Sequence, residues 1–290
     1  MTQSGQLALV TGASSGIGLA TAVKLGKQGF RVIAAARRMG RLNELAARFE
    51  NIIPKRVDLA DTTEIDAFCE YLSGLSKPVT VLINNAGYSL RGVIEDVSLD
   101  AARRLFQVNV FSVIQLIQTC LPRMREMREG TIVNLSALAG KMAFPNNGVY
   151  AATKHAIEAI TDALRMEVRP FGIRVIAIRP GFVSTEFNNV ADAMTGDLFK
   201  RTDPDYRPVY QAIWDGIGNM LVNKKISRPG LIADVIIKAV ISESPRAAYS
   251  VGLFSEEFLA RRARIDDDAF DDYMSDMTGL KGMKPTGALE

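Results

Sequence analysis

The sequence predicts an α/β protein, a single domain with a doubly wound, seven-stranded parallel sheet in the strand order 3-2-1-4-5-6-7. Short apolar runs alternate with helix-like segments along the chain, which is the pattern of βαβ units. Several of these runs are apolar almost without alternation, as expected for strands that are covered on both faces. With 48% hydrophobic residues, a chain of 290 residues has enough apolar side chains for one large core.

The elements follow one another in the expected order. The predicted strands are Leu7–Val10, Arg31–Ala36, Ile52–Val57, Val79–Ile83, Thr131–Leu135, Ile173–Ile178 and Ala248–Val251. The predicted helices are about 17–28, 40–49, 62–73, 99–127, 149–169 and 229–243. Pro54, in the third strand, has no N–H to give to a sheet, which is tolerated at an edge. The third strand is an edge strand in this order, so the proline supports the topology.

Two segments depart from the alternation within the predicted domain 1–290. Residues 186–228 are helical and aromatic, and we interpret them as a lid-like insertion before the last strand. Residues 254–290 are predicted to be a C-terminal helical extension. Its amphipathic part, Phe254–Ile265, fits a solvated or interface helix, with docking on a membrane surface as the alternative.

Composition excludes several classes of protein. The 35 basic and 32 acidic side chains leave a net charge of +3, which argues against a nucleic-acid partner. Two cysteines and the single histidine, His155, argue against a disulfide framework, a zinc site or Ser–His–Asp catalysis, so we expect no metal. The first residues lack a signal-peptide pattern, and glutamines interrupt the longest uncharged run, Leu105–Pro122. We expect a soluble, cytoplasmic protein without an integral membrane segment.

A glycine-rich turn follows the first strand directly. It reads Thr11-Gly12-Ala13-Ser14-Ser15-Gly16-Ile17-Gly18, and a helix follows it. Three glycines allow a tight turn, close approach of the backbone to a pyrophosphate, and close packing of helix on strand. The helix start then presents free N–H groups to the anion. An ordinary glycine-rich βα turn is the alternative, and the strand before and the helix after favour the phosphate site.

The glycine spacing, GxxxGxG, resembles that of the classical short-chain dehydrogenase/reductase family. The other motifs of that family follow in chain order: Asn84-Asn85-Ala86-Gly87, Asn109, Ser136, Tyr150-x-x-x-Lys154, and Pro180-Gly181 with Thr185. The resemblance covers residues 5–185 well and the rest loosely. It implies a Rossmann fold and an enzyme acting on CH–OH donors with a nicotinamide cofactor. The chain length and the insertion look most like the hydroxysteroid and retinol dehydrogenase-like branch.

The resemblance also implies which residues bind the dinucleotide. Asp58 matches a position that touches the adenine, the turn at Asn85 and Gly87 closes that side of the pocket, and Thr185 binds the carboxamide of the nicotinamide. The whole expected set is Gly12, Ser14, Ser15, Gly16, Ile17, Gly18, Arg37, Arg38, Asp58, Leu59, Asn85, Ala86, Gly87, Tyr150, Lys154, Pro180, Gly181, Val183 and Thr185.

The charge pattern near the second strand predicts the kind of nicotinamide cofactor. An acidic residue about 20 positions after the glycine turn would hold the ribose 2′-hydroxyl of NAD. This chain has Arg37 and Arg38 there, and no Asp or Glu between Met1 and Asn43. Arginines suit a 2′-phosphate, since one charge pair at about 4 Å is worth roughly 4 kcal/mol at an effective dielectric of 20. We therefore expect NADP(H), the alternative being that the arginines only solvate a helix start.

Tyr150 and Lys154 are four residues apart in a predicted helix, so their side chains share one face. An ordinary tyrosine has a pKa near 10, about three units too high for efficient proton transfer at neutral pH. Three units are roughly 4 kcal/mol, about what one nearby cation supplies. We expect the Lys154 ammonium to lower the pKa of Tyr150, with oxidised nicotinamide adding to the effect.

The family resemblance gives this constellation its roles. Tyr150 would donate the proton to the carbonyl oxygen in reduction and accept it in oxidation, Ser136 would hydrogen-bond the same oxygen, and Lys154 would hold the nicotinamide ribose. Asn109 would fix a water that links the lysine to solvent; a buried polar residue in a long helix is the alternative. The hydride passes directly between nicotinamide and substrate, so neither a metal nor a covalent intermediate is needed.

Apolar side chains are expected around the open end of the site. The predicted substrate contacts are Ser136, Leu138, Phe144, Tyr150 and Phe187. Further candidates in the insertion are Val190, Met194, Phe199, Tyr206, Tyr210, Ile213, Trp214, Ile217 and Met220. Such a lining suits a bulky lipophilic alcohol or carbonyl compound, although these residues are equally explained as the core of the insertion. In the family the helices at 105–122 and 149–169 pair across a dimer axis, so we expect a homodimer.

The sequence thus favours an NADP(H)-dependent oxidoreductase that interconverts a lipophilic alcohol and its carbonyl compound. A non-catalytic NADP(H)-binding redox sensor is the alternative from another class, and the intact Ser136, Tyr150 and Lys154 speak against it. Epimerisation or dehydration on the same scaffold is a third reading. The absence of a C-terminal domain of nucleotide-sugar size disfavours it.

Overall fold

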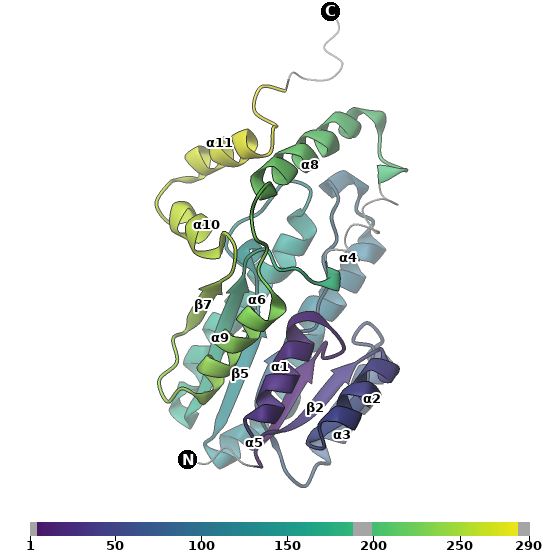
Figure 1. Cartoon of the computed structure of the whole chain (residues 1–290), viewed down its shortest axis with the longest axis vertical. Coiled ribbons are helices and arrows are strands. Elements are labelled where there is room, and N and C mark those ends of the chain that lie inside the picture. Colours follow the sequence, from purple (N-terminus) through teal and green to yellow (C-terminus); the bar gives the residue numbers. More distant parts are fainter. Residues whose placement is uncertain (1–4, 188–198, 284–290) are drawn as a thin grey trace, which may run out of the picture.

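A computed structural model of the chain describes residues 5–187 and 199–283 (Figure 1). Its centre is a seven-stranded parallel sheet in the order β3-β2-β1-β4-β5-β6-β7, as predicted. The strands are β1 (Leu7–Thr11), β2 (Arg31–Ala36), β3 (Ile52–Arg56), β4 (Val79–Asn84), β5 (Gly130–Leu135), β6 (Ile173–Pro180) and β7 (Ala248–Val251). Pro54 lies in the edge strand β3, opposite Ala34, so the edge position inferred from the proline is confirmed.

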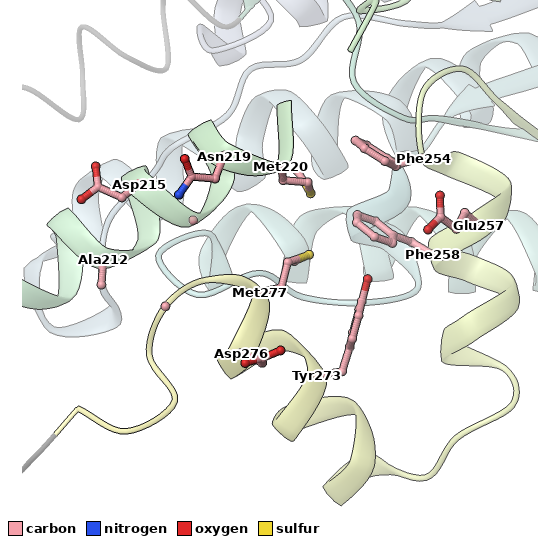
Figure 2. Close-up of a pocket in the computed structure, with 12 residues that line it drawn as sticks. Ala212, Asp215, Asn219, Met220, Phe254, Glu257, Phe258, Tyr273, Asp276 and Met277 are labelled. Carbon is pink, nitrogen blue, oxygen red and sulfur yellow. The ribbon is translucent and has the colours of Figure 1, made fainter. Parts of the chain in front are cut away.

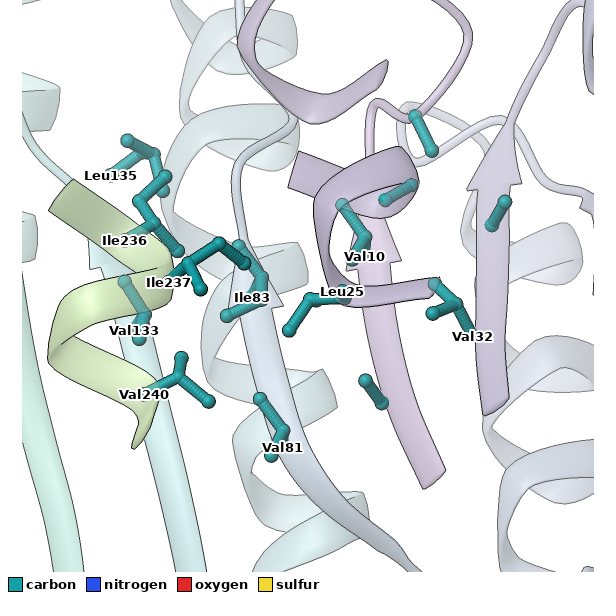
Figure 3. Close-up of a cluster of buried hydrophobic side chains, with 14 of the residues drawn as sticks. Val10, Leu25, Val32, Val81, Ile83, Val133, Leu135, Ile236, Ile237 and Val240 are labelled. Atoms are coloured by element: carbon teal, nitrogen blue, oxygen red, sulfur yellow. The ribbon is translucent and has the colours of Figure 1, made fainter. Parts of the chain in front are cut away.

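Helices cover both faces of the sheet. On one face lie α1 (Gly16–Lys27), α2 (Met39–Arg48) and α9 (Pro229–Ile241), and on the other α3 (Thr62–Ser73), α5 (Ser112–Met127) and α6 (Gly148–Val168). Figure 3 shows the first layer, in which Ile236 and Val240 of α9 pack toward Val133 of β5 and Val81 of β4. Each layer is a continuous apolar cluster, which explains why the strand sequences show almost no polar alternation.

The helix expected at 99–127 is not regular along its length. It consists of α4 (Leu99–Phe106), a π-helical turn (Gln107–Phe111) and α5. Wide turns of this kind are frequent at functional sites, and this one carries Asn109. In the part of the chain that the structure describes, only the run Leu99–Met127 is long and apolar enough to cross a membrane. Half of its most apolar window is buried, and α5 packs on β4 and β5.

Between β6 and β7 the described chain contains a 3₁₀ turn (Pro204–Tyr206), α8 (Arg207–Leu221) and α9. After β7 follow α10 (Ser255–Arg262) and α11 (Asp267–Met277), which lie with α8 at one end of the molecule (Figure 1). Tyr210 ties α8 to the turn before α4, since its hydroxyl donates to Asp96 at 2.8 Å and accepts from the Val93 N–H at 3.0 Å. This end of the fold stands over the carboxyl ends of the strands.

Candidate active site

One cavity of about 650 Å³ opens at the carboxyl ends of the strands, the place where open α/β sheets bind ligands. All the predicted cofactor residues except Gly18 line it, and so do all the predicted substrate residues. Asn109 is not among the lining residues. A separate hollow of about 570 Å³ lies between α8, α10 and α11, with Met220, Phe258 and Tyr273 on its walls (Figure 2). None of the predicted catalytic or cofactor-binding residues lines it.

The glycine turn has the conformation that its sequence predicts. Gly12 and Gly16 have φ angles of +67° and +56°, in the left-handed region that favours glycine. A Cβ atom on Gly12 would lie 2.8 Å from Asn85 Nδ2, and one on Gly18 would overlap the Gly12 carbonyl. Gly18 therefore allows the start of α1 to pack closely on the turn and on Asn85, while Gly12 and residues 14–17 line the cavity.

The loop after β4 is held against this turn by hydrogen bonds. The Thr11 hydroxyl accepts from the N–H groups of Asn85 and Ala86, both at 3.0 Å. Asn85 Nδ2 in turn donates to the Thr11 carbonyl at 2.8 Å. These bonds place Asn85, Ala86 and Gly87 on the wall of the cavity beside the glycine turn.

Asn109 also holds the loop after β4, through hydrogen bonds to the backbone of Tyr88. Its Oδ1 accepts from the Tyr88 N–H at 3.1 Å, and its Nδ2 donates to the Tyr88 carbonyl at 3.0 Å and to Thr153 Oγ1 at 3.1 Å. A Cβ on Gly87 would lie 3.0 Å from Asn109 Oδ1 and 3.8 Å from Lys154 Nζ. Asn109 is thus buried and hydrogen-bonded near Lys154, and its role in fixing a water stays a prediction of the family resemblance.

Ser136, Tyr150 and Lys154 reach one part of the cavity from the end of β5 and from α6. Lys154 Nζ donates to the Leu135 carbonyl at 2.7 Å and lies 5.9 Å from the centre of the Tyr150 ring, so the two side chains share a helix face. The Ser136 hydroxyl is buried and has no hydrogen-bond partner among the described residues. A buried hydroxyl without a partner, at a cavity wall, is suited to receive a ligand oxygen.

The electrostatics of Tyr150 correct one prediction. Burial raises its pKa well above the usual range, and the nearby Arg91 lowers it only in part. Burial also lowers the pKa of Lys154 to about 8, with Glu158 opposing the shift. The prediction that Lys154 lowers the pKa of Tyr150 is therefore wrong for these side chains, because burial outweighs any such effect. The physical reason is that both groups sit in the same desolvated place, which disfavours both charged forms.

Arg38 connects the basic end of the cavity to the glycine turn. Its Nη2 donates to Ser15 Oγ at 2.7 Å, and its Nε to Ser14 Oγ at 3.2 Å. Its Nη1 pairs with Glu186 at 2.6 Å, and Arg41 pairs with the other oxygen of the same carboxylate at 2.7 Å. Arg37 is exposed and also lines the cavity.

Glu186 was not predicted from the sequence, because acidic residues were expected to matter for the cofactor only near the glycine turn. The usable signal was its place directly after Thr185, a residue already assigned to the nicotinamide.

The loop after β6 crosses over the glycine turn. Gly181 has no room for a side chain, because a Cβ there would overlap the Leu253 carbonyl. Thr185 then comes so near that its Cγ2 lies 3.2 Å from the point where a Cβ on Gly16 would be. Pro180, Gly181, Val183 and Thr185 thereby border the same cavity as the start of α1.

On the substrate side, one aromatic ring packs on Tyr150. The ring of Phe187 packs edge-on at 5.9 Å between ring centres, and Leu138, Phe144, Trp214 and Ile217 complete an apolar wall. Phe199 and Tyr210 instead pack with Trp214, and Tyr206 bonds to Glu95, so this part of the insertion forms its own core. Val190 and Met194 lie outside the described residues.

The single histidine and the buried cysteine lie away from the cavity. His155 is exposed on α6, where its Nδ1 lies 2.9 Å from the Ala151 carbonyl. Cys120 is buried in the layer behind β4 and β5, and burial raises the pKa of its thiol to about 12. Neither residue lines the cavity.

The residues present fit a dinucleotide. Arg38 and Arg41 already bind the Glu186 carboxylate, so they can bind an anion, and Ser136, Tyr150 and Lys154 line the same cavity as Arg38. Charged groups at one end and apolar walls at the other match the two halves of a reaction complex of phosphate-bearing cofactor and small substrate.

Comparison with known proteins agrees with the geometry. Residues 6–195 match the family model described as short chain dehydrogenase. The chain is 33% identical to a probable short-chain type dehydrogenase/reductase, VdlC, of Helicobacter pylori, over 88% of this chain and 91% of the relative. It is 31% identical to retinol dehydrogenase 8 of Bos taurus, over 100% of this chain and 89% of the relative.

Solved structures show the same architecture. A short-chain dehydrogenase of Streptomyces avermitilis superposes with a TM-score of 0.76 at 28% identity, covering 98% of this chain and 100% of that one. A serine dehydrogenase complexed with NADP⁺ gives a TM-score of 0.72 at 25% identity, covering 86% and 95%. A Burkholderia phymatum structure in complex with NAD gives 0.75 at 22% identity, covering 100% and 99%. The structural likeness therefore does not choose between the two nicotinamide cofactors.

Proposed function

The chain belongs to the short-chain dehydrogenase family, and on this premise we propose that it is an NADP(H)-dependent oxidoreductase. It interconverts a lipophilic secondary alcohol, or an aldehyde–alcohol pair, and the corresponding carbonyl compound. The observation that carries the proposal is the single cavity of about 650 Å³. Ser136, Tyr150 and Lys154 line it together with the glycine turn and the neighbouring Arg37 and Arg38.

The charges at the turn support NADP(H) over NAD(H). Arg37, Arg38 and Arg41 stand near the position where the ribose 2′-substituent of a dinucleotide would lie in this fold. Arg38 and Arg41 already bind a carboxylate, which shows that both guanidiniums can close on one anion. A 2′-phosphate carries more negative charge than a carboxylate and takes the same bidentate contacts.

The catalytic chemistry is divided among three side chains. The bound nicotinamide supplies or accepts the hydride. Tyr150 donates a proton to the substrate oxygen in reduction, and its raised pKa keeps that proton in place through the neutral range. The free hydroxyl of Ser136 orients the same oxygen. Lys154, anchored on the Leu135 carbonyl, supplies positive charge next to the phenol as the alkoxide develops.

The walls around Tyr150 support a lipophilic substrate. Leu138, Phe144 and Phe187 line that end of the cavity, together with Trp214 and Ile217 of α8. A sugar would leave its hydroxyls unpaired against these side chains, at a cost of about 1–3 kcal/mol for each. Similarity to a protein named retinol dehydrogenase 8 points the same way.

We also propose a cytoplasmic homodimer that uses α5 and α6. Phe111, at the start of α5, and Met166 on α6 are large apolar side chains with 52% and 71% of their surface exposed. A partner helix layer would cover them. Sedimentation velocity would measure a dimer mass if this is right and a monomer mass if it is not.

Turnover and binding measurements test the function. A panel of steroids, retinoids, aromatic ketones and medium-chain aldehydes should be incubated with NADPH or NADH and followed by cofactor absorbance. We expect turnover of at least one apolar carbonyl compound, with a Michaelis constant for NADPH at least tenfold below that for NADH. An equal or lower constant for NADH would contradict the cofactor assignment. Binding of cofactor without turnover of any compound would favour a redox sensor.

A further inference from the structure

Glu186 forms ion pairs with two arginines beside the glycine turn, Arg38 and Arg41. Its Oε2 lies 2.6 Å from Arg38 Nη1 and its Oε1 lies 2.7 Å from Arg41 Nη1. Each guanidinium thus holds one oxygen of a single carboxylate. These contacts lower the pKa of Glu186, so the group is charged throughout the neutral range. Two arginines closing on neighbouring anionic oxygens is also the arrangement by which proteins bind a phosphate group.

The other contacts of Arg38 fix where this anion lies. The guanidinium is pinned by Ser14 Oγ and Ser15 Oγ, at 3.2 and 2.7 Å, both within the glycine turn. Ser14, Ser15, Arg38 and Glu186 all line the large cavity. The carboxylate therefore lies at the part of the cavity where the ribose is expected. In the sequence it is 148 positions from Arg38, one of the two arginines that it neutralises.

A carboxylate and a 2′-phosphate compete for these guanidiniums, because Glu186 already occupies Nη1 of both Arg38 and Arg41 and the two anions repel each other. We infer that Glu186 holds the place of the 2′-phosphate in the cofactor-free protein and competes with it, so that Glu186 sets the selectivity between NADP(H) and NAD(H). This inference rests on the proposed function, which assigns Arg38 to the 2′-phosphate.

This competition lowers the affinity for NADPH but does not affect the affinity for NADH. NADPH must displace Glu186 from Arg38 and Arg41 before its phosphate can bind them, so its affinity is reduced by the strength of those ion pairs. NADH has a hydroxyl at that position and leaves the ion pairs in place. Removing the charge of Glu186 should therefore tighten NADPH and leave NADH unchanged. Arg38 and Glu186 are each nearly half exposed, so the gain is modest.

Glu186→Gln tests the inference by a change in the ratio of two dissociation constants. Calorimetric titration of the full-length protein should give a Kd for NADPH about three- to tenfold lower in the variant, with the Kd for NADH within about twofold of wild type. Asp234→Asn is the matched control, since Asp234 pairs with Lys24 at 2.6 Å and neither residue lines the cavity. We expect this control to change neither constant.

The outcomes separate this inference from the cofactor proposal. An unchanged ratio in Glu186→Gln, or weaker NADPH binding, would overturn the inference even if wild type prefers NADPH. If wild type binds NADH more tightly than NADPH, and Glu186→Gln shifts the ratio of the two dissociation constants toward NADPH, the inference stands. The cofactor proposal is then refuted.

Discussion

Burial decides the charge state of single residues in this site. Lys154 is 5% exposed, and its pKa falls to about 8 from an ordinary value of 10.5 because its ammonium loses water. Below pH 8 the folded protein carries this buried charge at a cost. Between pH 8 and 10.5 the unfolded chain binds more protons than the folded one, so the free energy of unfolding rises with pH across that window.

This linkage predicts a result for Lys154→Met. As the pH rises from 8 to 10.5, the free energy of unfolding of wild type should increase by roughly 3 kcal/mol relative to that of Lys154→Met. Urea denaturation of both proteins at several pH values in this window measures the difference. Other tyrosines and lysines titrate in both proteins alike, so they cancel. A difference that stays flat with pH would show that Lys154 is not desolvated as described.

Most of the site residues were predictable one by one, but their charge states were not. The glycine turn, Ser136, Tyr150 and Lys154 follow from motif and spacing, and the structure brings all of them to one cavity. The high pKa of Tyr150 depends on how deeply the fold buries it, which spacing does not reveal. Glu186 was missed for a related reason, since a contact over 148 positions is a property of the tertiary fold.

At the scale of elements, α6 carries a buried ion pair beside the catalytic residues. Glu158, one turn after Lys154, accepts from Arg179 of β6 through both carboxylate oxygens, at 2.9 and 2.7 Å. Its side chain is only 3% exposed, and Lys141 lies 3.4 Å away. The pair joins α6 to the end of β6, just before Pro180 and Gly181 turn into the cavity. It therefore fixes α6, which supplies Tyr150, against the end of β6, where the loop that borders the cavity begins.

Glu158→Gln should lower the free energy of unfolding by about 2–4 kcal/mol, because Arg179 would keep a largely buried charge without a carboxylate. Asp162→Asn is the matched control. Asp162 pairs with Arg165 one turn further along α6 but is 46% exposed, so we expect a loss of about 1 kcal/mol or less. Denaturant unfolding at pH 7 compares the two. Equal small losses would mean that the Glu158–Arg179 pair is as weak as a surface pair.

The type and order of the helices and strands were predicted better than their exact ends and internal geometry. The strands and their order follow from apolar runs and from Pro54, while the strand ends differ by a residue or two. The π-helical turn Gln107–Phe111 was not predicted, because it shifts the hydrogen-bond pattern without breaking the helical spacing of apolar side chains. The turn carries Asn109, whose side chain forms two hydrogen bonds to the Tyr88 backbone and so holds the loop after β4.

At the scale of the whole molecule, the fold separates two environments within one cavity. The basic end is built from β2, the glycine turn and the loop after β6, and the apolar end from α6 and α8. Sequence patterns predicted both environments but not which aromatic residues of the insertion would face them. Only the packing of α8 shows that Trp214 and Ile217 line the cavity while Tyr210 anchors the helix to Asp96.

In the proposed reaction, Tyr150 transfers the proton while a nicotinamide dinucleotide is bound. Tyr150→Phe tests it most directly, because the change removes one oxygen and keeps the ring that packs on Phe187. Tyr249→Phe is the control, since the Tyr249 hydroxyl bonds to the Arg246 N–H and Tyr249 does not line the cavity. We predict that kcat falls by about 10²–10⁴-fold in Tyr150→Phe while its Kd for NADPH stays within about twofold of wild type. Turnover at wild-type rate in Tyr150→Phe would contradict the account.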